Sequence, residues 1–314
     1  MSISKETVTS LKGMGFLRNR GTELFSGRVV SAGGVYTVRE LNAIAECAEK
    51  YGNGKVAFTS RQAAEIVGIP FDLVPAAQEF LAAVGLSFGG TGARVRPITA
   101  CKGTTCVFGN LDTQAMAREL HERFYLGMHT VTLPHKLKIG IGGCPNSCAK
   151  PSLNDVGIEA RVHFSVNGEA CRACKTCAAA LACRSGAIAL KDGVATVDPD
   201  RCRHCGLCIG KCPFGAFPKE AERVCLVTVG GTWGKIRRDG TPLPFTVPAE
   251  RVGDTVEAIL LWYRENGYVG ERLGATVDRI GADSLVAAIL DGSLLERREE
   301  ILARPLTVRP ETAR

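Results

Sequence analysis

Length, apolar content and charge set broad limits on what this chain is. It has 314 residues, of which 45% are apolar, which is enough for two or three domains with their own cores. The net charge of +7 is dispersed among acidic residues and only 6% of the residues are aromatic, so the sequence lacks the dense basic face with interleaved aromatics that marks nucleic-acid binding. No uninterrupted apolar run of about 18 residues predicts a membrane span. The first residues lack the basic and apolar regions of a secretory signal, so we expect a cytoplasmic protein.

The N-terminal part, residues 1–95, contains no cysteine cluster and alternates between predicted helices and strands. The first predicted helix, residues 37–51, begins with the capping-box pattern Thr-x-x-Glu. Residues 55–59 then predict a strand, and residues 71–84 predict a second amphipathic helix closed by a glycine. This alternation indicates an α+β half-domain.

The rest of the chain is divided by its cysteines. Residues 96–162 hold two cysteine pairs, residues 163–220 hold eight cysteines in two similar blocks, and residues 221–314 return to β/α alternation before a poorly ordered tail. We therefore predict that 163–220 is inserted into one domain formed by 96–162 and 221–314. Within that outer domain the patterns predict helices at 112–125 and 255–266 and strands at 136–141 and 224–229.

Fourteen cysteines dominate the chemistry of this sequence, and twelve of them lie in tight local groups. In a reducing cytosol such groups indicate metal ligands rather than disulfides. The other two, Cys47 and Cys225, are isolated, and we interpret both as buried structural residues.

The second block of the insertion has the spacing of a bacterial ferredoxin. Three cysteines two residues apart surround one [4Fe–4S] cluster, and a fourth, followed by proline, reaches a second cluster. A zinc site wants two separated Cys-x2-Cys knuckles, which this spacing matches poorly. The four cysteines of this block are Cys202, Cys205, Cys208 and Cys212.

The first block repeats the pattern with one irregularity. It consists of Cys171, Cys174, Cys177 and Cys183, in which the last gap is two residues longer than usual and Arg184 replaces the proline. The sequence Gly-Ala-Ile after Cys183 nevertheless resembles Gly-Ala-Phe after Cys212. We predict a two-cluster ferredoxin with crossed ligands, in which Cys212 completes the cluster of the first block and Cys183 completes that of the second. Cys183 is the ligand that the irregular spacing leaves most open.

A second constellation lies outside the insertion. Cys101 and Cys106 are separated by four residues, and Cys144 and Cys148 by three, in the context Gly-Gly-Cys-Pro-Asn-Ser-Cys. The two glycines allow the backbone to approach a bulky group closely. From the residues alone, this is a further iron–sulfur or zinc site.

With these motifs the chain resembles the siroheme-dependent nitrite and sulfite reductase family. The strings CKGTTC and LPHKLKIGIGGCPNSC, together with the inserted ferredoxin, look like the catalytic C-subunit of bacterial anaerobic sulfite reductases. The first pair has four intervening residues where the family usually has five. GGTWGK (230–235) and GERLG (270–274) are similar to later family motifs. The resemblance implies a single copy of a repeat that larger members carry twice.

The family implies a coupled cofactor. The four cysteines would hold one [4Fe–4S] cluster, Cys148 would also bridge to the siroheme iron, and Asn146 in the same loop would contact the cofactor. With the insertion this makes three [4Fe–4S] clusters and one siroheme.

The family's substrate site is lined by two arginines and two lysines. By local context these are Arg61, Arg96, Lys136 and Lys138, with Arg94 as a competitor of Arg96. The two lysines alternate on the predicted strand, so they share a face. Cations there suit an oxyanion at an anionic macrocycle, and lysines also donate protons.

The resulting hypothesis is a cytoplasmic sulfite reductase subunit that reduces sulfite to sulfide with six electrons. A nitrite reductase and a non-catalytic multi-cluster electron-transfer protein are the alternatives. The sequence has no Gly-x-Gly-x-x-Gly fingerprint for flavin or nicotinamide, so we expect separate iron–sulfur and flavin donor proteins. With a single repeat, we also expect a homo-oligomer or hetero-oligomer in which Arg61, Lys136 and Lys138 face a neighbouring chain's siroheme.

Overall fold

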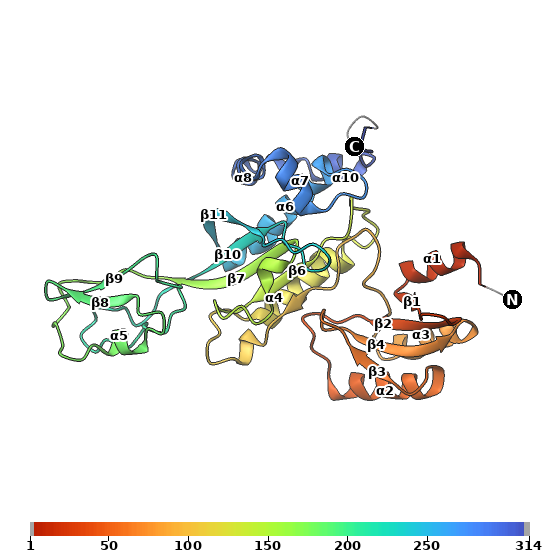
Figure 1. Cartoon of the computed structure of the whole chain (residues 1–314), viewed down its shortest axis with the longest axis horizontal. Helices are drawn as coiled ribbons and strands as arrows, with labels where there is room; N and C mark the ends of the chain where they lie inside the picture. Colours follow the sequence, from red (N-terminus) through yellow and green to blue (C-terminus); the bar gives the residue numbers. More distant parts are fainter. Residues whose placement is uncertain (1–2, 311–314) are drawn as a thin grey trace.

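The computed structural model describes residues 3–310 and consists of a small N-terminal sheet, a larger central sheet and a projecting insertion (Figure 1). The end of the predicted tail, residues 311–314, lies outside the described residues. Within the described part of the chain, none of the helices combines the length and apolarity that a bilayer span requires.

The N-terminal sheet has four antiparallel strands in the order β1-β2-β4-β3. Helices α2 and α3 pack on it around one buried cluster that includes Phe16, Phe25, Ile44 and Ile69. The α+β half-domain predicted from the sequence therefore matches the observed architecture. Its elements are α1 (Lys5–Gly13), β1 (Phe16–Arg18), β2 (Leu24–Val29), α2 (Val38–Tyr51), β3 (Val56–Phe58), β4 (Ala64–Pro70) and α3 (Val74–Ala82).

The predicted start of α2 is confirmed, whereas the predicted start of the next α-helix, α3, is corrected. In α2 the Thr37 hydroxyl accepts from the Glu40 amide at 3.2 Å and the Glu40 carboxylate accepts from the Thr37 amide at 2.6 Å, which is the predicted capping box. The helix predicted at 71–84 begins instead with a 3₁₀ turn, Phe71–Leu73. The α-helix starts only at Val74 because a proline occupies its first turn.

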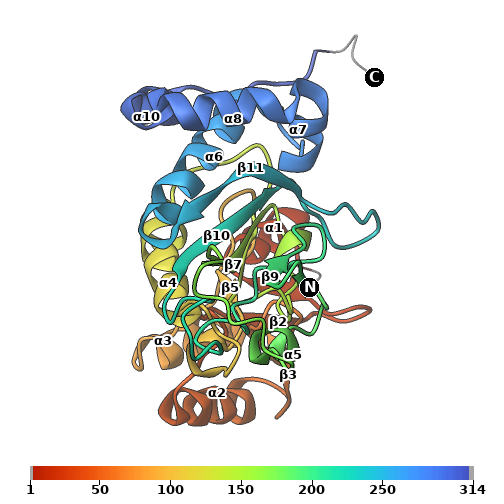
Figure 2. The same ribbon diagram turned by 90° about the vertical axis from the view of Figure 1, so that its left-hand side faces the viewer.

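The central sheet has five strands in the order β11-β10-β7-β6-β5. The strands β5, β6 and β7 are parallel, whereas β7, β10 and β11 are antiparallel. Figure 2 shows α4 and α6 beside one face of this sheet and the remaining C-terminal helices stacked beyond its β11 edge. The elements are β5 (Thr99–Ala100), α4 (Thr113–Leu120), β6 (Ile139–Gly142), β7 (Val156–His163), β10 (Glu222–Val229), β11 (Thr241–Pro248), α6 (Val252–Asn266), α7 (Leu273–Ile280), α8 (Ala282–Asp291), α9 (Ser293–Glu296) and α10 (Arg298–Ala303).

The strand predicted at 136–141 starts later than expected. Only Leu137 makes a bridge, to Val95, before β6 begins at Ile139. The reason is a tertiary contact: the Lys138 amide donates to the Asp155 carboxylate at 2.8 Å instead of joining the strand ladder. The predicted helix at 112–125 also changes character, because α4 ends at Leu120 and continues as a π-helical turn, His121–Leu126.

The insertion leaves the central sheet after β7 and returns through β10, its direct neighbour. His163 and Glu222 are paired across these strands, so the two connections lie side by side. The segment between them forms α5 (Ala178–Ala182) and a hairpin of β8 (Ile188–Lys191) and β9 (Val194–Val197). It has its own small buried cluster around Phe217, and it projects to the left in Figure 1.

Candidate functional site

The cysteines of the second constellation lie together at the ends of two parallel strands. Cys101 follows β5, and Cys144 and Cys148 lie in the loop after β6, so the carboxyl ends of adjacent strands bring them to one place. Cys106 joins them through a 3₁₀ turn. All four line one cavity of about 560 Å³. Burial raises the pKa of Cys144, and the charges of the other three thiols add to that rise.

The walls of this four-cysteine cavity have the shape and chemistry of a cluster site. The Gly143 amide donates to the Cys101 sulfur at 3.1 Å. A Cβ on Gly143 would lie 2.9 Å from the Gly103 Cα, and one on Gly109 would lie 2.0 Å from the Gly103 carbonyl oxygen, so only glycine allows these loops to approach each other. Across residues 3–310, no three His, Cys, Asp or Glu side chains converge on a single-ion position. Four thiols around one cavity are the ligand number that a [4Fe–4S] cluster takes.

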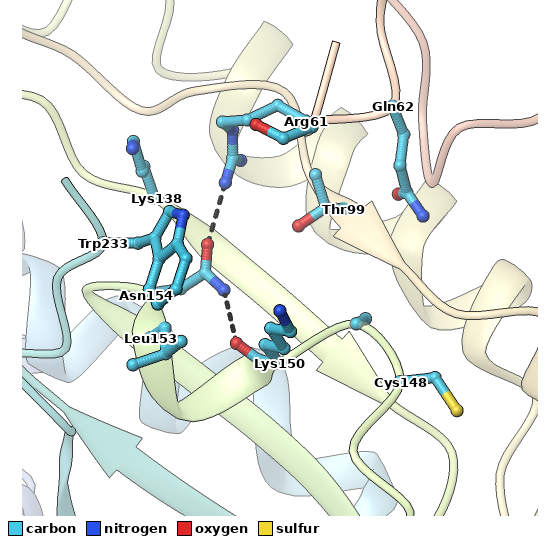
Figure 3. A pocket seen from close by; sticks show the side chains of 11 residues that line it. Arg61, Gln62, Thr99, Lys138, Cys148, Lys150, Leu153, Asn154 and Trp233 are labelled. Carbon is cyan, nitrogen blue, oxygen red and sulfur yellow. Dashed lines mark hydrogen bonds between the residues drawn. The ribbon is translucent and has the colours of Figure 1, made fainter. Parts of the chain in front are cut away.

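A second cavity, of about 300 Å³, adjoins the first, and we call it the cation cavity. Figure 3 shows its lining, with Arg61, Lys138 and Lys150 around Asn154 and with Cys148 at one side. Cys148 lines both cavities. Cys148, the residue predicted to bridge to the siroheme iron, is thus shared by the linings of the four-cysteine cavity and the cation cavity.

Arg61 is held in the loop between β3 and β4 by neutral partners. Its guanidinium donates to the Asn154 Oδ1 and to the Pro97 carbonyl oxygen, each at 2.8 Å. Next to it, Gln62 adopts a left-handed conformation (φ 59°) and exchanges two hydrogen bonds with the Ala100 main chain, which fastens the loop to β5. Burial lowers the pKa of Arg61 to about 10. No carboxylate in residues 3–310 forms an ion pair with its charge.

Asp155 is a carboxylate whose charge acts on Arg61 and Lys138, and it is already paired. It is fully buried, and Arg272 holds it with contacts of 2.7 to 3.0 Å. Its other hydrogen bond comes from the Lys138 amide. Burial, with the charges of Arg61 and Arg272, lowers the pKa of Lys138 to about 8. The cation cavity therefore keeps excess positive charge, which favours an anionic ligand.

The other two predicted cations lie near the cation cavity but do not line it. Arg96 donates to the Gly90 carbonyl oxygen, and its buried Nε has no partner in the described residues. Burial lowers the pKa of Arg96 to about 10, and burial with the charge of Arg272 lowers that of Lys136. Arg94 contacts His129 in a separate cavity instead, so Arg96 is the arginine that shares the field of Arg61.

His135 lies between Pro134 and Lys136, and its surroundings disfavour the protonated ring. Its Nδ1 accepts from the Lys136 amide at 2.7 Å. Burial, with the charges of Lys136 and Arg272, lowers the pKa of His135 to about 4. An imidazolium proton is therefore not available from this residue near pH 7.

Several lining residues of the cation cavity were not predicted from the sequence. The Lys150 ammonium lies 5.1 Å from the centre of the Trp233 ring, and both residues line the cavity with Asn154. Trp233 belongs to the GGTWGK motif, so the motif could have drawn attention to it. Nothing in the sequence distinguishes Lys150 or Asn154 from other polar loop residues.

In the insertion, Cys183, the cysteine with the irregular spacing, lies near the cysteines of the second block. Cys183, Cys202, Cys205 and Cys208 line one small cavity. Burial raises the pKa of Cys208 to about 12, and the thiols of the other three contribute to that rise. This is the grouping that the crossed arrangement predicts. Of the remaining set, Cys171, Cys177 and Cys212 pack against the core of the insertion.

The two fourth cysteines also have equivalent surroundings. Burial raises the pKa of Cys183 and of Cys212, but hydrogen bonds from nearby groups, mainly backbone amides, outweigh it and leave both pKa values lowered. Gly186 and Gly215, each three residues after its cysteine, have φ values of 62° and 81°. The pseudo-repeat seen in the sequence is therefore present in the backbone as well.

The chain matches known proteins over most of its length. Residues 91–294 match the nitrite and sulphite reductase 4Fe-4S domain, and residues 18–84 match the nitrite/sulfite reductase ferredoxin-like half domain. An uncharacterised protein of Methanocaldococcus jannaschii is 32% identical over 84% of this chain and 90% of its own length. The coenzyme F420-dependent sulfite reductase of that organism is 31% identical over 87% of this chain, which spans only 42% of that protein.

The chain is also similar to a subunit of a sulfite reductase and, in its fold, to a solved structure. The C-subunit of the anaerobic sulfite reductase of Salmonella typhimurium is 32% identical over 69% of this chain and 66% of its own length. The crystal structure of dissimilatory sulfite reductase I has the same fold, with a TM-score of 0.67 at 22% identity over 85% of this chain and 69% of that one. The chain is therefore a member of the nitrite and sulphite reductase family of oxidoreductases, with the family's 4Fe-4S domain and its ferredoxin-like half domain.

Proposed function

We propose that this chain is the catalytic subunit of a siroheme-dependent sulfite reductase that reduces sulfite to sulfide. The observation that supports this most is the position of Cys148, which lines both the four-cysteine cavity and the cation cavity. A relay protein needs only the first cavity. The cation cavity, with Arg61 and Lys138, would give a reducible anion a place to bind beside the cluster.

The four cysteines match the number of ligands that the cluster part of the implied cofactor needs. Cys101, Cys106, Cys144 and Cys148 would hold a [4Fe–4S] cluster, with Cys148 also on the siroheme iron, and Asn146 lines the same cavity. When bound, this centre would supply the electrons for the reduction, one at a time.

The roles of the chain's own side chains follow from their chemistry. Arg61 has no carboxylate partner, and the guanidinium N–H groups that do not bond to Asn154 and Pro97 remain as donors for the oxygens of a small oxyanion. Lys138 has a pKa lowered to about 8, so near neutral pH it is charged yet gives up its proton readily. We assign anion binding to Arg61 and proton donation to Lys138, with Arg96 and Lys136 adding to the positive field.

We further propose that the insertion is a two-[4Fe–4S] ferredoxin, residues 163–220, which passes electrons to the four-cysteine site. The grouping of Cys183 with Cys202, Cys205 and Cys208 supports this. Electrons would come from separate donor proteins in the cytoplasm. Relatives that are subunits of multi-subunit sulfite reductases support an oligomer. Arg61, Lys138 and Cys148 line one cavity within a single chain, so a neighbouring chain would add to this arrangement rather than supply it.

One experiment tests the proposal as a whole. Anaerobically purified protein should show siroheme absorption bands and about twelve irons in clusters per chain, and it should turn over sulfite faster than nitrite. Siroheme bands with faster turnover of nitrite would reassign the substrate. If the protein contains iron but no siroheme and turns over neither anion, it is an electron-transfer protein and not a reductase. Size-exclusion chromatography of the same sample tests the oligomer, because a fully active monomer contradicts it.

A further inference from the structure

Asn110 connects the four-cysteine site to the insertion through two hydrogen bonds. Its main-chain amide donates to the Gly143 carbonyl oxygen at 2.8 Å, directly before Cys144. Its side-chain Nδ2 donates to the Cys205 carbonyl oxygen at 3.1 Å. One residue thus contacts a loop of the four-cysteine cavity and a cysteine loop of the insertion at the same time.

The surroundings of Asn110 show that the two loops are closely packed there. A Cβ added to Gly206, which has a φ of 77°, would lie 3.2 Å from the Asn110 Oδ1 and 2.9 Å from a Val162 methyl group. Cys144 and Cys205 line the same cavity of about 250 Å³. Phe108 lines this cavity as well as the four-cysteine cavity, and the Arg184 guanidinium lies 4.9 Å from the centre of its ring.

The insertion has other attachments, which do not involve Asn110. The Val162 amide donates to the His204 carbonyl oxygen at 2.9 Å, and the Arg161 guanidinium donates to the Arg203 carbonyl oxygen at 3.1 Å. These bonds run from β7 to the insertion. They keep the insertion attached when the Asn110 side chain is changed, so Asn110 variants are expected to fold.

We propose that Asn110 is a positioning residue for electron transfer, which holds the Cys205 loop against the Cys144 loop and provides a hydrogen-bonded route between the two clusters. This inference rests on the proposed function. The route runs from Cys205 through its carbonyl oxygen to the Asn110 side chain, along Asn110 to its amide, and through the Gly143 carbonyl group to Cys144. In the loaded protein Asn110 would hold the two cysteine loops in place for one-electron transfer between the clusters that they would carry, a step in which no covalent bond is made or broken.

The test uses Asn110→Asp, which keeps the size and the main-chain amide but removes the donor to Cys205, and Asn110→Ala. Asn266→Ala is the matched control, because that side chain also donates one hydrogen bond to a carbonyl oxygen, far from the cysteines. In the full chain, hydrogen exchange of the 202–208 segment should become about fivefold faster in both Asn110 variants, the factor that one ordinary hydrogen bond contributes. The control should match the unsubstituted chain.

Two further readouts separate positioning from general stability. The spin–spin interaction between the reduced clusters of the loaded protein should weaken in the Asn110 variants, and transfer of electrons from the insertion to the catalytic centre should slow. Unchanged exchange and unchanged spin coupling would overturn the proposal. The exchange measurement does not depend on sulfite turnover, so failure of the proposed function and failure of this inference are distinguishable.

Discussion

The Asp155 carboxylate joins Lys138 to Arg272: it accepts the Lys138 amide at 2.8 Å and is held by the Arg272 guanidinium at 2.7 Å. Arg272 belongs to the GERLG motif and lies directly before α7, so this motif reaches the cation cavity through a buried ion pair. In this pair the positive charge of Arg272 compensates the negative charge of Asp155. It thereby fixes the backbone of Lys138 without neutralising the cavity that Lys138 lines.

Replacing Asp155 by Asn is predicted to destabilise the protein strongly. The Asn oxygen still accepts the Lys138 amide, but Arg272 is left as a largely buried charge without a partner, which costs about 3 kcal/mol. The unfolding midpoint in urea or on heating should fall accordingly. Asp278→Asn is the matched control, because its ion pair with Arg238 leaves the carboxylate largely exposed and contributes about 1 kcal/mol or less. Equal effects of the two substitutions would contradict the role given to Asp155.

Replacing Arg61 by Ala is predicted to weaken sulfite turnover without loss of iron. Removing a donor aimed at an oxyanion lowers kcat/KM by about 100-fold or more, and Arg61→Lys should recover only part of this because the fork of donors is lost. Steady-state rates with sulfite and the iron content of each variant are the measurements. Arg18→Ala, which breaks an exposed ion pair in the same domain, serves as control and should leave both unchanged. An unaltered kcat/KM in Arg61→Ala would remove this residue from the site.

The sequence predicted helices, strands and cysteine groups better than it predicted the contacts between side chains that are distant along the chain. Periodicity and a capping box located α2, and cysteine spacing identified two separate constellations, because both signals lie within a few residues. The late start of β6 was missed, since it depends on Asp155, a residue far along the chain from the strand's predicted beginning. Asn154 and Lys150 were missed for the same reason: their position in the cation cavity is created by tertiary contacts that leave no local pattern.

The activity is predicted to fall as the pH rises through about 8. Lys138 has a pKa lowered to about 8 by burial and by the charges of Arg61 and Arg272, so below this pH it is protonated and above it the cation and its proton are lost. The plot of kcat/KM against pH should decline about tenfold per unit on the alkaline side. In Lys138→Arg this decline should move to higher pH, with a lower maximum because arginine does not donate its proton.

The control for this pH profile is a lysine that lies outside the site. Lys55→Arg changes an exposed residue before β3 and should reproduce the unsubstituted profile. An alkaline decline that stays near pH 8 in Lys138→Arg would show that another group titrates there, and proton donation would have to be reassigned.

Replacing Cys183 by Ser is predicted to remove one of the two clusters that we propose for the insertion. Cys183 shares a cavity with Cys202, Cys205 and Cys208, so its loss leaves three thiols for a cluster that needs four, and about four irons per chain should be lost. Cys225→Ala is the control: this thiol is buried in the core of the central sheet, away from the clustered cysteines, and its burial raises its pKa to about 12. Iron analysis and the spectrum of each variant give the answer. Full iron content in Cys183→Ser would exclude it as a ligand and would require another residue to complete the second cluster.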